Sequence, residues 1–501
     1  MPRRHTDFFT LVIDQGTSST KIFLFNKSHE IVFSRRLKHV LSQPKPFHVE
    51  VDALNIAESC LRLIKQALRY SQERDLPVLS IGLALQRSTF LFWDKKTGKP
   101  VSPALSWQDG RAHKIISELS ELKGLVFSKT GAPLNSHFGG PKFLHLIRHD
   151  PALKRGVLQG KLWFGPLSAY LIHYLTGTAA VDHTIASRSL VMDLNSGVYD
   201  NDLLNIFSMP ASCLPNLVPS IHNYGHLVLS GSKIPVKCVI GDQQAALLGH
   251  NGWKKGRVAI NLGTSASVQI NAGKSPAHIP GLISSVLYSD YGQKSYFIEG
   301  TVNSCNSIFY WLEKELKIPH EAMLWHERCL NTTTDLVLIP GFAGLAAPYW
   351  VDKIPFTLND NIKHRPLDET IRAGMESIGF LVYDIWEQVL QHLNLKPHIV
   401  RVSGGGARKP LLQFITDLCR FKIGRVQTKD STALGVHYLL LKADGIKPVP
   451  IHHDFEEIFS PLMKPSLKNE KLLNWHGALK AAGIRKEVSF QKSDFRGECD
   501  V

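Results

Sequence analysis

The sequence predicts a mixed α/β protein made of two related halves. A chain of 501 residues is too long to fold around a single hydrophobic core of ordinary size. We therefore expect two domains of about 100–200 residues each, with insertions. Residues 9–26 and 256–273 share one pattern of strand, Gly-Thr-Ser and strand. Residues 236–250 and 402–419 each combine an apolar strand, glycine and a following helix. Strands, glycine turns and helices in this order are typical of the α/β class.

The composition is that of a globular protein, with 44% hydrophobic and 20% charged residues. No apolar run approaches the roughly 20 residues that cross a bilayer, and no signal-peptide core follows the N-terminal arginines. The 7 cysteines are scattered without a CxxC pair, which favours reduced thiols over disulfides or a zinc site. We therefore expect a cytoplasmic protein with no membrane partner.

The formal net charge of +15 is spread along the chain rather than gathered into a dense basic block. A diffuse positive field of this kind suits anionic small molecules. We expect a small-molecule substrate and no nucleic-acid partner.

The first repeat, "LVIDQGTSSTKIFLFN" at residues 11–26, predicts a hairpin with a tip of glycine and hydroxyl residues. Glycine permits unusual backbone geometry, and the N–H groups and hydroxyls of such a tip can hold phosphate oxygens. A plain hairpin turn explains either copy alone. The repetition of Gly-Thr-Ser in residues 256–273 favours phosphate binding.

The two repeats differ at a position that matters for the chemistry, where the first carries Asp14 and the second Asn261. One carboxylate can hold Mg²⁺, often through water, whereas an amide on the other side only forms hydrogen bonds. The first tip is therefore expected to handle metal and phosphate, and the second to clamp from the opposite side.

The segment between the repeats begins with a helix over residues 51–74, for which Asp52 is a candidate cap. Two strand segments follow in residues 78–93. The loops around Arg87 and in residues 104–112 are polar and aromatic, and they fit either a substrate pocket or a surface loop with a packed tryptophan.

In residues 236–250 an apolar strand stops at Gly241, and Asp242 begins a helix. A carboxylate is favoured at a helix N-terminus, and an N-cap role is the simplest explanation. The position at a strand end, just before the second repeat, also places Asp242 where a cleft between two halves would lie. A base there could take a proton from a hydroxyl.

The glycine triplet of residues 402–419 lies between a strand and a helix. Such a turn allows close approach of a phosphate or a flat ligand, which favours a nucleotide site over a plain turn. It is not GxGxxG with a downstream acid, so a dinucleotide-binding fold is poorly supported.

The motifs "DQGTSSTK", "QRSTFLFWDKKTGKPVSPALSWQDGRA", "DHTIASRSLVMDL", "GDQQAALLGH", "NLGTSAS", "FAGLAAPYW" and "SGGGARKPLLQF" occur in this order. With them the chain, from about residue 9 to 445, resembles the FGGY family of carbohydrate kinases, and its glycerol kinase branch most closely. The resemblance implies two ribonuclease H-like domains of the actin-like ATPase type around a central cleft. We assign residues 1–250 and 251–484 to them, with a loose polar tail at 485–501.

The resemblance also implies ATP and Mg²⁺ as cofactors, and transfer of the γ-phosphoryl group to a hydroxyl of a polyol or sugar. Whether the protein forms a homo-oligomer is left open. The implied catalytic base is Asp242, and the implied metal-linked acid is Asp14. The implied substrate-binding residues are Arg87, Trp107, His137, Asp242 and Gln243. The implied nucleotide-binding residues are Thr17, Ser18, Ser19, Lys21, Gly263, Thr264, Asn306, Tyr310, Gly405 and Lys409.

Departures from glycerol kinases cluster in the expected substrate pocket. Ser88, His137 and Ser267 stand where that branch has glutamate, tyrosine and phenylalanine. A buried hydroxyl that loses its partner costs about 1–3 kcal/mol. A larger ketose such as xylulose or ribulose, or a sugar alcohol, is therefore an alternative acceptor. A second alternative is a sugar- or nucleotide-binding regulator with weak catalysis.

On the nucleotide side, Lys21 stands where glycerol kinases usually have arginine, and Ser403 and Lys409 where they have aspartate and asparagine. Asn306 and Tyr310 replace a glycine and a glutamine. Because other branches of the family tolerate variation at these positions, we expect ATP use to be less affected than the identity of the acceptor, which depends on the pocket residues.

Overall fold

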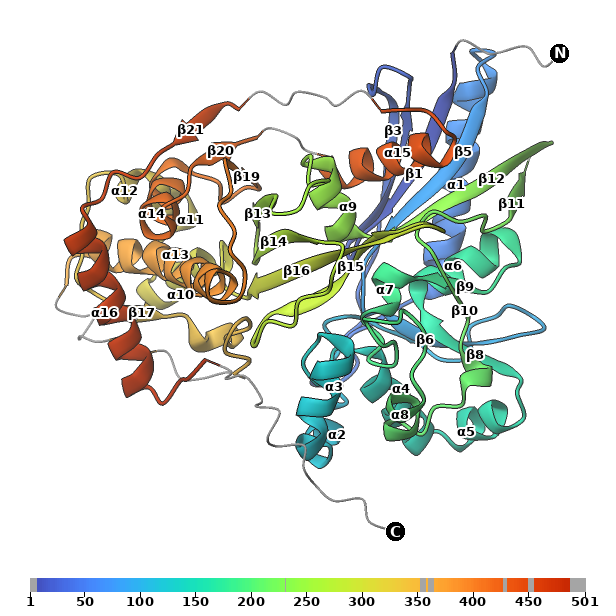
Figure 1. The fold of residues 1–501 in the computed structure, drawn as a ribbon, viewed down its shortest axis with the longest axis horizontal. Helices are drawn as coiled ribbons and strands as arrows, with labels where there is room; N and C mark the ends of the chain where they lie inside the picture. The colour runs from blue at the N-terminus through green and yellow to red at the C-terminus, as the bar shows by residue number, and fades with distance from the viewer. Residues whose placement is uncertain are drawn as a thin grey trace.

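The computed structural model describes residues 7–229, 231–351, 357–358, 365–426, 430–448 and 455–486. Two large sheets dominate the fold, one formed by the first half of the chain and one by the second (Figure 1).

The first sheet has six strands in the order β11-β12-β5-β1-β2-β3. The hairpin β1/β2 is antiparallel, and β5 and β12 continue the sheet in parallel. Alternate side chains of β1 point to opposite faces of the sheet. Leu11 packs with helix α1 (Ala53–Gln72), and Val12 packs with helices α9 (Asp242–Gly249) and α15 (Ser431–Ala443). The strands are β1 (Phe9–Gln15), β2 (Ser19–Phe25), β3 (Ile31–Lys38), β5 (Val78–Leu85), β11 (His226–Leu229) and β12 (Ser232–Gly241).

Helix α1 (Ala53–Gln72) confirms the helix expected in residues 51–74. Asp52 is its N-cap, and the Asp52 side chain accepts a hydrogen bond from Asn55 N at 2.9 Å.

The second sheet repeats this plan. Its order is β15-β16-β14-β13-β19-β20-β21, with an antiparallel hairpin β13/β14 and a parallel neighbour β19. The expectation of two halves on one plan is therefore confirmed. The strands are β13 (Val258–Leu262), β14 (Ala266–Gly273), β15 (Ile283–Ser289), β16 (Lys294–Val302), β19 (Val400–Ser403), β20 (Ile423–Arg425) and β21 (Glu457–Phe459). The helices of this half are α10 (Ser307–Leu316), α11 (His320–Met323), α12 (Trp325–Arg328), α13 (Leu367–His392), α14 (Lys409–Cys419) and α16 (Pro465–Ala481).

A smaller four-stranded sheet, β4-β7-β6-β8, lies below the first large sheet in Figure 1. Its strands are β4 (Glu50–Val51), β6 (Phe90–Asp94), β7 (Ala104–Leu105) and β8 (Leu162–Pro166). The other elements of this region are α2 (His113–Glu118), α3 (Lys123–Thr130), α4 (Gly139–His149), α5 (Pro151–Leu158), α6 (Leu167–Thr176), β9 (Ala180–Asp182), α7 (His183–Ala186), α8 (Asn201–Ile206) and β10 (Asn216–Val218).

The second half also contains a two-stranded sheet, formed by β17 (Leu338–Ile339) and β18 (Thr357–Leu358).

Helix α15 (Ser431–Ala443) crosses from the second half of the chain to the first sheet, where its orange-red ribbon lies among blue strands in Figure 1. It packs against β1, β5, β12 and helix α9 (Asp242–Gly249). Glycines allow α9 and α15 to meet backbone to backbone, because a Cβ on Gly435 would lie 1.9 Å from Ala245 O. Helix α15 thus fixes the helix that begins at Asp242.

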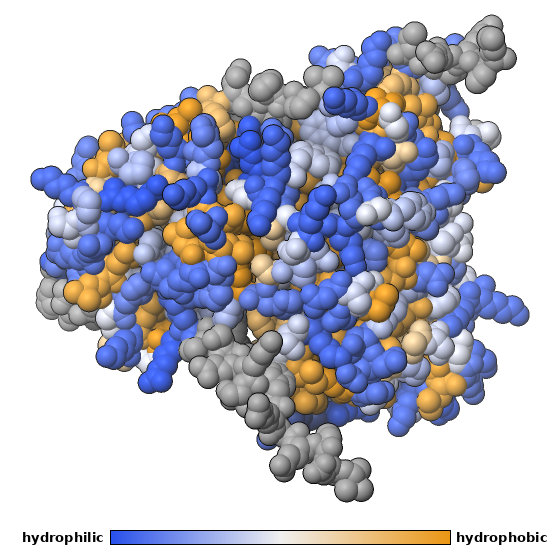
Figure 2. All heavy atoms as spheres, viewed as in Figure 1, coloured by the Kyte–Doolittle hydropathy of each residue, from blue (hydrophilic) through white to orange (hydrophobic). Residues whose placement is uncertain are grey.

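Hydrophilic side chains cover most of the face shown in Figure 2, with apolar side chains in smaller patches between them. Among the residues that the structure describes, no helix combines the length and the apolar character that membrane crossing requires.

The expected tail at 485–501 falls almost wholly outside the described residues, which end at Lys486. The Lys486 ammonium pairs with Asp384 at 3.2 Å and also with Glu387, so the chain at this point is held against α13.

Substitution of Gly435 by alanine should destabilise the protein by roughly 1–3 kcal/mol, because the new methyl group forces α9 and α15 apart. Gly477→Ala is the matched control, since nothing lies within 4 Å of a Cβ at that position of α16. Alanine there should be neutral or stabilise by up to about 1 kcal/mol. Chemical denaturation measures both, and equal free energies of unfolding for the two variants would contradict this packing.

Candidate active site

Asp14 and Lys21 are direct partners across the first hairpin. Asp14 lies two residues after Val12 on the strand face that carries α9 and α15. The Lys21 ammonium lies 3.3 Å from Asp430, just before α15. Burial raises the pKa of Asp14 to about 6, with Lys21 opposing the rise and the charges of Asp242 and Asp430 adding to it. Three carboxylates thus share one region of the interface between the two sheets.

The tip of the first hairpin is a tight turn, in which Gly16 N donates to Ser19 O at 3.0 Å. Thr17 is half-buried and its hydroxyl accepts a hydrogen bond from Trp107 Nε1 at 2.8 Å. Ser18 is exposed, whereas Ser19 begins β2 and is buried. The structure therefore joins the expected phosphate loop to the expected substrate loop through Thr17 and Trp107.

Asp242 is the first residue of α9, and Gly241, not Asp242, is the N-cap. The carboxylate accepts a hydrogen bond from Gln243 N at 2.7 Å. Burial raises the pKa of Asp242, although the positive charge of Arg87 opposes the rise. The simple N-cap explanation is thus wrong, and the carboxylate faces the residues that the sequence assigned to the substrate.

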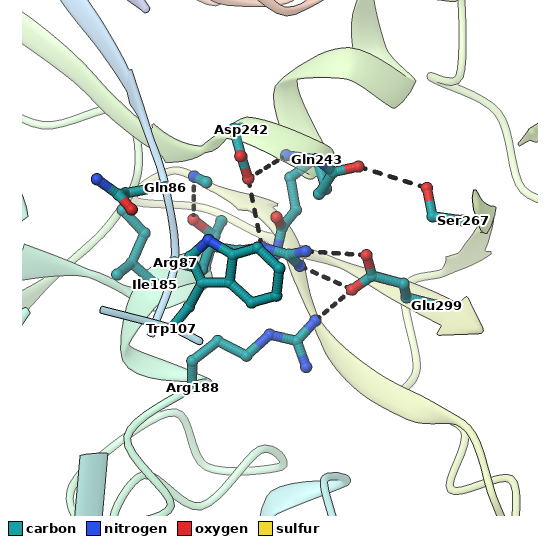
Figure 3. Close-up of polar contacts among 12 residues, drawn as sticks. Gln86, Arg87, Trp107, Ile185, Arg188, Asp242, Gln243, Ser267 and Glu299 are labelled. Atoms are coloured by element: carbon teal, nitrogen blue, oxygen red, sulfur yellow. Dashed lines mark hydrogen bonds and ion pairs between the residues drawn. The ribbon is translucent and has the colours of Figure 1, made fainter. Parts of the chain in front are cut away.

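Arg87 occupies the centre of this site (Figure 3). Its Nε lies 3.4 Å from Asp242 Oδ1, and its Nη1 and Nη2 each donate to Glu299 at 2.8 Å. Arg188 Nη2 donates to the same carboxylate at 2.6 Å. Glu299 is 1% exposed, and although burial raises its pKa, the two arginines outweigh this and hold the pKa below its usual range.

Gln243 joins α9 to the second sheet. Its Oε1 accepts hydrogen bonds from Gln269 Nε2 at 2.7 Å and from Ser267 Oγ at 3.4 Å. Ser267 is paired with Asn261 across the second hairpin, immediately beside the Gly-Thr-Ser tip. Both hairpins therefore converge on Asp242 and its neighbour.

Trp107 is 40% exposed and lies over the site in Figure 3. His137 Nδ1 contacts the Trp107 carbonyl at 2.6 Å. Beneath them, the buried Lys142 ammonium contacts the carbonyls of Ser88 and Ser106, each at 2.7 Å. Lys142 thereby ties the two loops that carry Arg87 and Trp107. The role of these loops in binding a substrate stays a prediction.

The second hairpin tip contacts the start of α10. Gly263 N donates to Ser265 O at 2.9 Å, and the carbonyls of Gly263 and Thr264 accept from Asn306 N and Cys305 N, each at 3.1 Å. The Thr264 side chain is exposed. Asn306 is thus placed directly at the hairpin tip, and its role in nucleotide binding stays a prediction.

The glycine triplet packs against the same hairpin. A Cβ on Gly404 would lie 2.3 Å from Leu262 O, and one on Gly406 would lie 2.8 Å from Asn306 Oδ1. Gly404 also has a φ of +104°, which disfavours other residues. Gly405 is exposed, and its Cβ would be 3.8 Å from Asn306 Nδ2. Packing therefore accounts for two of the glycines and leaves Gly405 open to a ligand.

Two expected nucleotide residues lie further out. Tyr310 is 58% exposed on α10, and its ring stacks on His320 with the centroids 5.7 Å apart. Lys409 is exposed at the first turn of α14. No described contact joins either residue to the hairpin tips.

Sequence reasoning missed Glu299, Arg188, Gln269, Asp430 and Lys142. Arg188 lay within a quoted motif, "DHTIASRSLVMDL", but its partner is 111 residues away in the sequence. Glu299 follows Phe297 and Ile298 in β16, and Gln269 stands between Val268 and Ile270 in β14. A charged or amide residue beside such apolar neighbours was the available signal.

A separate group of potential metal ligands, Asp384, Glu387 and His476, lies between α13 and α16. Lys486 already pairs with the carboxylates of Asp384 and Glu387, and Tyr349 and Trp475 each donate to Asp384 at 2.7 Å. This cluster has the character of a structural anchor for the C-terminal helix.

Comparison with known proteins agrees with this geometry. Residues 9–249 match the FGGY family of carbohydrate kinases, N-terminal domain, and residues 258–443 match its C-terminal domain. The glycerol kinase of Thermococcus onnurineus is 30% identical over 486 residues, covering 95% of this chain and 98% of that protein. The glycerol kinase of Borreliella afzelii is 31% identical over 487 residues, covering 94% and 97%.

Among solved structures, Plasmodium falciparum glycerol kinase with ADP has a TM-score of 0.87 at 29% identity, covering 95% of this chain and 98% of that one. A ligand-bound xylulose kinase from Lactobacillus acidophilus has a TM-score of 0.83 at 19% identity, with coverage of 95% and 98%, and shares the fold.

The fold and site define a two-domain phosphotransferase, and the fold prediction is confirmed. The chain belongs to the FGGY family of carbohydrate kinases. It is an ATP-dependent enzyme that phosphorylates an alcohol group, and it is similar to glycerol kinases.

The raised pKa of Asp14 predicts a pH-dependent stability cost. The folded state holds the Asp14 proton more tightly than the unfolded chain, whose aspartates titrate near 3.9. Between about pH 4 and 6 stability is therefore lost as the pH rises, and the loss at pH 8 is up to about 3 kcal/mol.

Asp14→Asn should raise Tm at pH 8, and this gain should vanish near pH 4, while kinase activity is lost. The exposed Asp75→Asn is the control, which should leave Tm unchanged at both pH values. A Tm change in Asp14→Asn that does not vary with pH would contradict the assigned environment.

Proposed function

We propose that this kinase transfers the γ-phosphoryl group of ATP to a hydroxyl of a polyol or sugar bound beside Asp242. The observation that carries the proposal is the convergence of both Gly-Thr-Ser hairpins on α9. Asp14 of the first hairpin lies within electrostatic range of Asp242, and Ser267 of the second contacts Gln243.

In the proposed mechanism, Asp242 accepts the proton of the attacking hydroxyl, and its raised pKa suits it to this task. Arg87 and Gln243 orient the acceptor from either side of the carboxylate. Trp107 covers the site and links it to the first phosphate loop through Thr17. Closure around the substrates excludes water, which would otherwise compete with the acceptor for the phosphoryl group.

The two hairpin tips are proposed to hold the triphosphate. Thr17, Ser18, Ser19 and Lys21 would act from the first sheet, and Gly263 and Thr264 from the second. Gly405 would contact the adenine side, with Asn306, Tyr310 and Lys409 near the nucleotide. Lys21 is held by Asp430 at 3.3 Å, so phosphate binding would exchange one anionic partner for another.

The donor set around Asp14 fits a divalent cation. Three carboxylates share this region, and the pKa of Asp14 is raised first by burial and then by the charges of Asp242 and Asp430. Carboxylate oxygens are ligands that Mg²⁺ prefers. We propose that Asp14 holds Mg²⁺, either directly or through a bound water molecule. The bound ion would neutralise charge on the phosphate oxygens.

Asp242→Asn should lower kcat by roughly 10²–10⁴, because the amide cannot accept the proton. ADP affinity should stay near normal, since Asp242 lies on the acceptor side. Steady-state kinetics and calorimetric ADP titration measure both. Unchanged kcat in this variant would overturn the assignment of the base.

A larger acceptor than glycerol is the second candidate. Ser88 and Ser267 are small residues at positions where the glycerol kinase branch has glutamate and phenylalanine. Ser267, Gln243 and Gln269 also form a polar, hydrogen-bonded surface that could bind additional hydroxyls. This surface favours a ketose such as xylulose or ribulose, or a sugar alcohol.

Acceptor specificity can be measured by ADP release over a panel of polyols, ketoses and sugar alcohols. We expect at least one acceptor of four or more carbons to exceed glycerol in kcat/KM. Ser88→Glu should shift the preference towards glycerol by roughly tenfold or more, because it restores a carboxylate acceptor for a glycerol hydroxyl. Silence across the panel with intact ADP binding would favour the regulatory protein instead.

A further inference from the structure

Glu299 has no role in the proposed mechanism, although its carboxylate accepts hydrogen bonds from two arginines of the site. Both of its oxygens are used: Oε1 accepts from Arg87 Nη2, and Oε2 accepts from Arg87 Nη1 and from Arg188 Nη2. The Arg87 and Arg188 side chains are 13% and 3% exposed. Such a buried, charge-assisted fork fixes the plane of the Arg87 guanidinium.

The network spans the two large sheets. Arg87 follows β5 of the first sheet, Arg188 follows α7, and Glu299 belongs to β16 of the second sheet (Figure 3). Gln269 is the direct cross-strand partner of Glu299, and it holds Gln243 at 2.7 Å. Two adjacent residues of the second sheet therefore hold both side chains that flank Asp242.

The Glu299 carboxylate keeps the Arg87 guanidinium from forming a bidentate ion pair with Asp242. Arg87 directs only its Nε edge at Asp242, at 3.4 Å, while its fork is occupied by Glu299. Without Glu299 the fork is free to form a paired contact with the Asp242 carboxylate. Such a contact would occupy the oxygens that must accept the substrate proton.

We propose that Glu299 is a positioning residue, which presents Arg87 to the acceptor from across the interface between the sheets and keeps its fork away from Asp242. This inference rests on the proposed function, because it assigns Glu299 an effect on acceptor phosphorylation. Glu299 acts through Arg87 and does not itself touch the reacting atoms.

The test separates the kinetic parameters of the two substrates. Glu299→Gln keeps the shape of the side chain but removes its charge, and it should lower kcat/KM for the acceptor by roughly 10²-fold through misplacement of Arg87. KM for ATP should stay within about twofold of the wild type. Glu118→Gln, which removes an exposed carboxylate paired with Arg148, is the control and should change neither.

Loss of Glu299 leaves two buried guanidinium groups facing each other, so Glu299→Gln could also reduce stability. The double variant Glu299→Gln/Arg188→Met removes one charge of each sign and should recover Tm. We expect it to keep the acceptor defect. Recovery of acceptor kinetics together with Tm would show a purely structural role and overturn the proposal.

A double-mutant cycle with Arg87→Met completes the test. Because Glu299 acts through Arg87, Glu299→Gln should add little to the acceptor defect in the Arg87→Met background. Fully additive losses, or wild-type acceptor kinetics in folded Glu299→Gln, would overturn the proposal. A wild-type protein that phosphorylates no acceptor would instead contradict the proposed function.

Discussion

In the proposed mechanism the site depends on one electrostatic constraint: the partly buried carboxylate of Asp242 must stay close to Arg87 without forming a full ion pair with it. Asp242 meets Arg87 only through the Nε edge, because Glu299 occupies the guanidinium fork. Burial keeps the pKa of Asp242 raised, which suits a proton acceptor, whereas a full bidentate pair with Arg87 would lower that pKa and make the carboxylate a weaker base. Helix α15 adds the mechanical part of the constraint, since its glycine contact with α9 fixes the backbone at Asp242.

The sequence predicted much of this architecture because its signals are local. The paired Gly-Thr-Ser hairpins, the Asp52-capped helix and the strand that ends at Gly241 each depend on residues close together in the chain. The likeness to a known family then placed Arg87, Asp242 and Gln243 in one site, and the structure brings these three together.

What the sequence could not supply are contacts between distant segments. Glu299 and Arg188 meet Arg87 only after two sheets pack together, and no local pattern marks such a pairing.

At the glycine triplet the sequence pattern was clear, but packing explains most of it. The sequence favoured ligand approach, whereas Gly404 and Gly406 are required by close contacts with Leu262 and Asn306. Tyr310 and Lys409 lie at exposed positions, where only a bound nucleotide could define a role.

The central claim is that both hairpin tips hold one triphosphate while Asp242 faces the acceptor. A crystal structure with Mg²⁺, a non-hydrolysable ATP analogue and an acceptor from the panel tests it most directly. The account predicts phosphate oxygens in contact with both the Thr17 and Thr264 loops, and an acceptor hydroxyl within about 2.6–3.2 Å of Asp242. Phosphates held by one loop alone, or an acceptor bound away from Asp242, would contradict it.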